Sequence, residues 1–268
     1  MIKLIASDMD GTLLNDRKEL PGDFFEVFDE LERRGIKFTV ASGRSFDAVA
    51  HLFPEEYRTR LDFICDNGAN VIHEGKQVSV TPLDRPTFEQ LIRACEDIGG
   101  LRVLVCAGRG TYHLTADAEF SAEIAKYYKN HIPCDDLLSV DDVIYKLAVC
   151  DMKGTQQHAK PAIDAIFGDR LNVQVSGPIW MDVMGAGVSK GSALRALGKH
   201  LGVSAEDTMA FGDFYNDADM LKHAGWSFAM ENGNPDIKRM TRFLARSNNE
   251  NGVLRAIRQY ALQEDSIK

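Results

Sequence analysis

The feature that most constrains the fold is an alternation of short apolar runs with amphipathic helical patterns. Residues 2–7 and 36–41 read as buried strands, and residues 22–34 between them carry apolar side chains at helical spacing. A helical pattern over 46–52 then leads to another strand-like run at 61–65. Because neighbouring parallel strands need a crossover that is usually a helix, this order predicts an α/β protein with a parallel sheet.

The last third of the chain repeats the same order of patterns. Its expected elements are helix 189–201, strand 208–211, helix 218–223, strand 226–230 and helix 252–262. Residues 83–184 carry helical and strand-like patterns of their own, among them a helix expected over 120–130. We therefore expect two domains, one formed by residues 1–82 with 185–268 and the other by the insertion 83–184.

Composition and charge exclude several classes of protein. The chain has 268 residues and no apolar run near the roughly 20 residues of a membrane helix. It starts with a strand-like pattern instead of a signal peptide, so we expect a cytoplasmic location and no membrane association. A formal net charge of −9 disfavours a nucleic-acid partner. The five cysteines lack zinc-ligand spacing and are expected to be reduced thiols.

A pair of carboxylates follows the first expected strand directly, in the segment Asp8-Met9-Asp10-Gly11-Thr12-Leu13. Ligands of open α/β sheets bind at the carboxyl ends of strands. An ionised Asp8 can attack phosphorus as a covalent nucleophile, and Asp10 can protonate the leaving oxygen and later deprotonate the attacking water. A turn rich in Asp and Gly also ends strands without any chemistry, so other segments at the same edge have to decide.

Three further segments are expected at that edge of the sheet. Ser42 and Gly43 follow the second strand and offer a hydroxyl and a backbone amide to a phosphoryl oxygen. Lys190, at the start of an expected helix, supplies a cation for the phosphate. The segment Gly212–Asp217 (GDFYND) follows another strand, and its hard oxygen ligands suit Mg²⁺. Together these segments predict a site for phosphoryl transfer.

With these motifs in this order, the chain resembles the haloacid dehalogenase superfamily phosphatases, specifically the Cof-type group with a large α/β cap. DMDGTL resembles the nucleophile motif, ASGR the Ser/Thr motif, VSKG the lysine motif and GDFYND the acidic motif, and DNGA and AMENG resemble further recurring segments. The resemblance covers nearly the whole chain. It implies a Rossmann-like core with a parallel sheet, and it implies that the inserted α/β cap, residues 83–184, sets the substrate specificity.

The resemblance also implies a role for each motif residue. Catalysis and Mg²⁺ binding would belong to three carboxylates: Asp8 as nucleophile and metal ligand, Asp10 as general acid/base and backbone-carbonyl metal ligand, and Asp213 as a further metal ligand. The phosphoryl group would be held by polar groups from three motifs, Ser42, Gly43, Lys190 and Asn216. Asp217 would orient Lys190 or a metal-bound water.

We therefore expect a Mg²⁺-dependent phosphatase that hydrolyses small phosphorylated metabolites, such as sugar phosphates or phosphorylated cofactors, without an obligate protein partner. Two alternatives stay open. A phosphotransferase or phosphomutase would pass the phosphoryl group from Asp8 to a sugar hydroxyl and release no inorganic phosphate. A regulatory protein would bind a phosphometabolite without turnover, but a pure binder has no need of a nucleophile beside an acid/base group.

Overall fold

The computed structural model describes residues 1–115, 120, 124 and 130–263, in two compact units that we treat separately. The core unit comprises residues 1–43, 53–79 and 189–268, and the inserted unit comprises residues 44–52 and 80–188. The helix expected over 120–130 lies almost wholly outside the described residues. Within the described part of the chain, every helix is too short or too polar to cross a bilayer.

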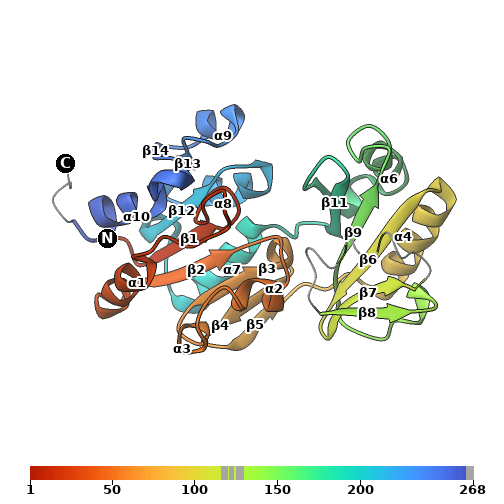
Figure 1. Cartoon of the computed structure of the whole chain (residues 1–268), viewed down its shortest axis with the longest axis horizontal. Helices are drawn as coiled ribbons and strands as arrows, with labels where there is room; N and C mark the ends of the chain where they lie inside the picture. The colour runs from red at the N-terminus through yellow and green to blue at the C-terminus, as the bar shows by residue number, and fades with distance from the viewer. Residues whose placement is uncertain (116–119, 121–123, 125–129, 264–268) are drawn as a thin grey trace. The chain divides into compact units, whose positions relative to one another are not determined.

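The described residues of the core unit contain an eight-stranded sheet with the order β14-β13-β12-β1-β2-β3-β4-β5 (Figure 1). Its strands are β1 (Leu4–Asp8), β2 (Lys37–Ala41), β3 (Asp62–Cys65), β4 (Asn70–His73), β5 (Lys76–Val80), β12 (Thr208–Gly212), β13 (Trp226–Met230) and β14 (Phe243–Ala245). From β14 to β3 neighbouring strands are parallel, while β4 runs antiparallel to β3. Strand β1 is buried along its whole length, as a central parallel strand should be.

Helices cover both faces of this sheet. They are α1 (Phe24–Arg33), α3 (Glu55–Arg58), α7 (Lys190–Leu201), α8 (Ala218–His223), α9 (Pro235–Met240) and α10 (Gly252–Ala256), which continues as a π-helical segment over Ile257–Ala261. Phe24 of α1 packs on Phe38 of β2 with ring centroids 5.5 Å apart. Leu194 of α7 and Met220 of α8 join a buried cluster with Ala6 of β1. Phe38 pairs with Ile5, the residue before Ala6 in β1. Because successive side chains of a strand point to opposite faces of the sheet, α1 packs on one face and α7 and α8 pack on the other.

The inserted unit has its own sheet, with the strand order β10-β11-β9-β6-β7-β8 among the described residues. The strands are β6 (Leu101–Ala107), β7 (Gly110–Leu114), β8 (His131–Cys134), β9 (Ile144–Asp151), β10 (Leu171–Val175) and β11 (Trp180–Gly185), and the helices are α2 (Phe46–Ala50), α4 (Arg85–Ile98) and α6 (Ala159–Phe167). Neighbouring strands are antiparallel except β7 and β8. Leu91 of α4 and Ile163 of α6 pack on Leu147 of β9 in one core. Both units combine helices with a sheet, so the expected α/β fold class is confirmed.

Candidate active site

Asp8 is the last residue of β1 and has only 6% of its surface exposed. The chain turns directly after it: the amide of Leu13 donates to the Asp8 carbonyl, and Gly11 adopts a φ of 83°. Strand β1 lies between β2 and β12. Residues that follow these two strands therefore share the carboxyl edge of the sheet with Asp8, and they include Ser42, Gly43 and Asp213.

Lys190 reaches this edge from the first turn of α7. The side chain of Ser189 caps the helix by accepting from the Ser192 amide at 2.9 Å. Gly68 lets the start of α7 approach closely, because a Cβ atom there would lie 2.1 Å from the Ser189 carbonyl oxygen. Lys190 is completely buried, and its Nζ donates to Asp8 Oδ1 at 2.5 Å. The helix thus delivers its single buried ammonium onto the carboxylate at the end of β1.

Asp217 connects Lys190 to the acidic segment after β12. Its Oδ1 accepts from Lys190 Nζ at 2.7 Å, and its Oδ2 accepts from the amides of Asp213 and Phe214 at 3.0 and 3.2 Å. Asp217 has no exposed surface. One oxygen of Asp217 is thus engaged by Lys190, and the other is engaged by the turn that carries Asp213.

A cluster of three carboxylates forms the negative part of the site. Oxygen atoms of Asp8, Asp213 and Asp217 lie within 4.8 Å of one another. Burial raises the pKa of Asp8 well above its usual value of 3.8; Lys190 opposes that rise, and Asp217 and Asp213 add to it. Burial, followed by the charge of Asp217, raises the pKa of Asp213 to about 6. Without a cation, the Asp8 and Asp213 carboxyls therefore hold their protons more tightly than free aspartate does, and their oxygens are ligands that fit a hard cation such as Mg²⁺.

Lys190 keeps its charge in spite of its position. Burial by itself would lower the pKa of Lys190, but Asp217 and Asp8 together raise it above its usual value. The ammonium is therefore a positive group beside Asp8, where it can bind an anionic substrate.

Asn67 is a site residue to which the sequence assigned no role. It is 2% exposed and has a left-handed φ of 53°. Its Oδ1 accepts from Asn216 Nδ2 at 3.3 Å, and a Cβ atom added to Gly43 would lie 3.0 Å from the same Oδ1. Asn67 thus joins two of the expected phosphate-binding positions. The sequence signal was present, because Asp66-Asn67-Gly68 follows β3 at the same edge of the sheet.

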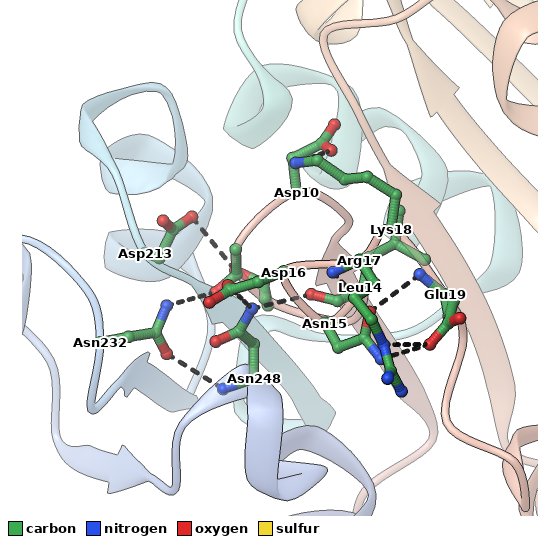
Figure 2. A network of polar contacts seen from close by, with 12 residues as sticks. Asp10, Leu14, Asn15, Asp16, Arg17, Lys18, Glu19, Asp213, Asn232 and Asn248 are labelled. Atoms are coloured by element: carbon green, nitrogen blue, oxygen red, sulfur yellow. Dashed lines mark hydrogen bonds and ion pairs between the residues drawn. The ribbon is translucent and has the colours of Figure 1, made fainter.

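Thr12 and Lys18 also contact carboxylates of the expected site. Thr12 Oγ1 donates to Asp213 Oδ1 at 3.2 Å, which ties the turn after β1 to the turn after β12. Lys18 Nζ lies 2.9 Å from Asp10 Oδ1, and Figure 2 shows the two side chains pointing toward each other. Each of the expected site residues lies in the core unit, from Asp8 in the first strand to Asp217 after β12.

Comparisons with known proteins identify the family to which the chain belongs. The family described as haloacid dehalogenase-like hydrolases matches residues 5–257. Similar curated proteins include the 5-amino-6-(5-phospho-D-ribitylamino)uracil phosphatase YbjI of Escherichia coli (strain K12), 30% identical over 96% of this chain and 95% of that protein, and the HMP-PP phosphatase of Klebsiella pneumoniae (strain 342), 28% identical over 89% and 87%. The solved structure of SMU.1108c from Streptococcus mutans UA159 matches with a TM-score of 0.89 at 27% identity, over 98% of this chain and 100% of that one. The resemblance seen in the motifs is confirmed: the chain belongs to the haloacid dehalogenase-like hydrolase family.

Proposed function

We propose that this protein is a Mg²⁺-dependent phosphatase of small phosphorylated metabolites and that it acts through an aspartyl-phosphate on Asp8. The observation that carries the proposal is the burial of Asp8 at the end of β1 against Lys190, with Asp213 and Asp217 beside it. The names of the relatives YbjI and HMP-PP phosphatase support a small phosphorylated substrate.

The first half of the reaction transfers the phosphoryl group to the enzyme. The oxygens of the phosphoryl group are held by the Lys190 ammonium, the Ser42 hydroxyl, the Gly43 amide and Asn216. A carboxylate oxygen of Asp8 then attacks phosphorus. The bond from phosphorus to the leaving oxygen breaks while Asp10 gives that oxygen a proton. The ion pair with Lys190 keeps the nucleophile oriented for attack.

The second half returns the enzyme to its starting state. Asp10 removes a proton from a water molecule, which attacks phosphorus and displaces Asp8, so inorganic phosphate leaves and Asp10 is protonated again. Asp8, Asp213 and the backbone carbonyl of Asp10 would hold Mg²⁺, and Asp217 would orient Lys190. When bound, Mg²⁺ neutralises the carboxylates and stabilises charge on the phosphoryl oxygens. We also propose that residues 1–82 with 185–268 form the catalytic core. The inserted domain, residues 83–184, would set the substrate preference.

Phosphate release tests the proposed function. A panel of sugar phosphates, nucleotides, pyridoxal phosphate and flavin mononucleotide should release phosphate with Mg²⁺ and lose that activity with a chelator. Ca²⁺ is larger and takes more ligands at longer distance, so it should bind but support much less turnover. Equal turnover with Ca²⁺, or turnover that survives the chelator, would contradict the metal's role. No release from any ester with Mg²⁺ bound would favour a phosphotransferase, a mutase or a regulatory protein.

The raised pKa of Asp213 predicts a pH-dependent response to the metal. Its folded pKa of about 6 exceeds the usual 3.8, so the folded state holds the proton more tightly. The contribution of Asp213 to metal-free stability therefore falls as pH rises between these values and is level above them. Because Mg²⁺ competes with that proton, it should raise the melting temperature more at about pH 7.5 than at about pH 5.

Thermal unfolding with and without Mg²⁺ at the two pH values measures this difference. The variant Asp213→Asn is the control, because it removes the titrating group and should abolish most of the Mg²⁺ response. An equal Mg²⁺ effect at both pH values in the unmodified protein would show that Asp213 is not a ligand.

A further inference from the structure

The loop of residues 15–19 is held closed by the side chain of Asn15. It follows the turn after Asp8 that contains Asp10 and Gly11, which we call the nucleophile turn. Asn15 Oδ1 accepts from the amides of Arg17 and Glu19 at 2.9 and 3.0 Å, and Asn15 Nδ2 donates to Glu19 Oε2 at 3.0 Å. The Lys18 amide donates to the Asn15 carbonyl at 2.9 Å. Lys18 has a φ of 63° inside this loop. Residues other than Gly and Asn rarely occupy that left-handed region, so the loop imposes this conformation on Lys18.

A second set of contacts anchors the loop to the rest of the core unit. Asp16 accepts from Asn248 Nδ2 on Oδ1 at 3.0 Å and from Asn249 Nδ2 on Oδ2 at 2.9 Å. Asn248 is 2% exposed, and its backbone amide donates to Asn232 Oδ1. Asn232 Nδ2 in turn donates to the carbonyl of Gly11 in the nucleophile turn at 2.8 Å (Figure 2). The loop and the turn that carries Asp10 are therefore fixed to one scaffold.

These contacts hold Lys18 beside Asp10, and the two side chains form an ion pair. Lys18 Nζ lies 2.9 Å from Asp10 Oδ1, yet the two side chains are 58% and 36% exposed. Exposed ion pairs contribute little to stability, so folding alone does not account for a left-handed lysine held by two sets of contacts. A backbone conformation of this kind, imposed by its surroundings, points to a role in function.

We propose that Lys18 is a positioning residue that fixes the orientation of the Asp10 carboxylate. The proposal rests on the proposed function, in which Asp10 gives its proton to the leaving oxygen as the bond to phosphorus breaks. With Lys18 bound to Oδ1, the proton moves from Oδ2 to the leaving oxygen in the first half-reaction and returns to Oδ2 from water in the second. Lys18 itself does not touch the phosphoryl group.

The test compares leaving groups in the Mg²⁺-loaded enzyme. An alkyl phosphate needs a proton on its leaving oxygen, whereas p-nitrophenyl phosphate has a stable leaving anion and needs little acid assistance. Lys18→Met should lower kcat/KM for a hexose phosphate about 10-fold, a fraction of the full effect of general acid catalysis, and leave p-nitrophenyl phosphate within about two-fold. Lys18→Arg, which keeps the cation, should recover part of the loss.

Arg17→Met is the matched control, because it removes the same charge from the same loop. Arg17 pairs with Glu19 and is 80% exposed, so both substrates should react at the unmodified rate. The melting temperatures of all three variants should equal that of the unmodified protein, which excludes a loss of folding. A crystal structure of Lys18→Met should show an intact loop with a reoriented Asp10 side chain.

Two results would overturn the assignment of Lys18. The first is an equal loss on both substrates in Lys18→Met, which would mean that Lys18 does not act through proton transfer. The second is a loss of the same size when Lys18→Met is added to Asp10→Asn, since a residue that acts through Asp10 has no further effect there. If the unmodified protein hydrolyses no ester of the substrate panel, the proposed function itself is wrong, and the Lys18 assignment fails with it.

Discussion

Replacing Asp8 by Asn is expected to abolish turnover, with kcat lowered by at least about 10⁴-fold, the scale seen when a covalent nucleophile is removed. A carboxamide has nearly the shape of the carboxylate but cannot attack phosphorus. The fold should be retained, because Asp8 is a buried carboxylate whose pKa burial already raises, and Asn removes one negative charge from the cluster. Lys190 keeps Asp217 as its partner.

Steady-state kinetics with an aryl phosphate and a thermal unfolding curve measure both halves of this prediction. Asp97→Asn, the same chemical change at an exposed carboxylate of α4, serves as the control and should leave activity unchanged. On an alkyl phosphate, whose leaving oxygen needs a proton, Asp10→Asn should be nearly as severe as Asp8→Asn. A raised KM with an unchanged kcat in Asp8→Asn would point to a role in binding, and a retained rate would exclude the covalent mechanism.

Replacing Lys190 by Met is expected to damage stability and activity together. Lys190 is completely buried and donates to both Asp8 and Asp217, so its loss leaves two buried carboxylates without their cation. Removing one partner of a buried charge pair costs about 3–5 kcal/mol of folding free energy. Losing the cation that faces the phosphoryl group should lower kcat by about 10²–10³-fold.

Urea unfolding without metal and kinetics with Mg²⁺ separate the two effects. Lys199→Met is the matched control, because Lys199 lies exposed in the last turn of the same helix. Mg²⁺ should recover part of the stability of Lys190→Met, since a cation bound to Asp8 and Asp213 replaces some of the lost charge. A Lys190→Met protein as stable and as active as Lys199→Met would contradict the role given to the buried ammonium.

Strong apolar periodicity made much of the core fold predictable. Helix 218–223 and strand 226–230 were expected with the bounds that the structure has, and β1, β2 and β12 lie within a residue or two of their expected ranges. Strands β4 and β5 were missed. In the structure, Glu74 and Gly75 between them have the positive φ of a tight hairpin turn. Strand β14 has three residues, too few for a pattern to show.

Part of the candidate site was likewise predictable from the sequence, and part was not. Asp8, Ser42 and Asp213 could be placed from sequence because each ends or directly follows a strand, and parallel strands bring their carboxyl ends to one edge. The contact between Lys18 and Asp10 depends on a left-handed backbone inside a loop, which no spacing of residues encodes. The link from Asn216 to Asn67 likewise joins residues 149 positions apart through a left-handed asparagine.

Acid quenching during turnover of a radiolabelled phosphate ester traps an aspartyl-phosphate if one forms. We expect transient label on the peptide that contains Asp8, no label in Asp8→Asn, and loss of the label when Mg²⁺ is removed before the substrate is added. Release of labelled phosphate at an undiminished rate with no label on the protein, or with the label on a different residue, would contradict an aspartyl-phosphate on Asp8.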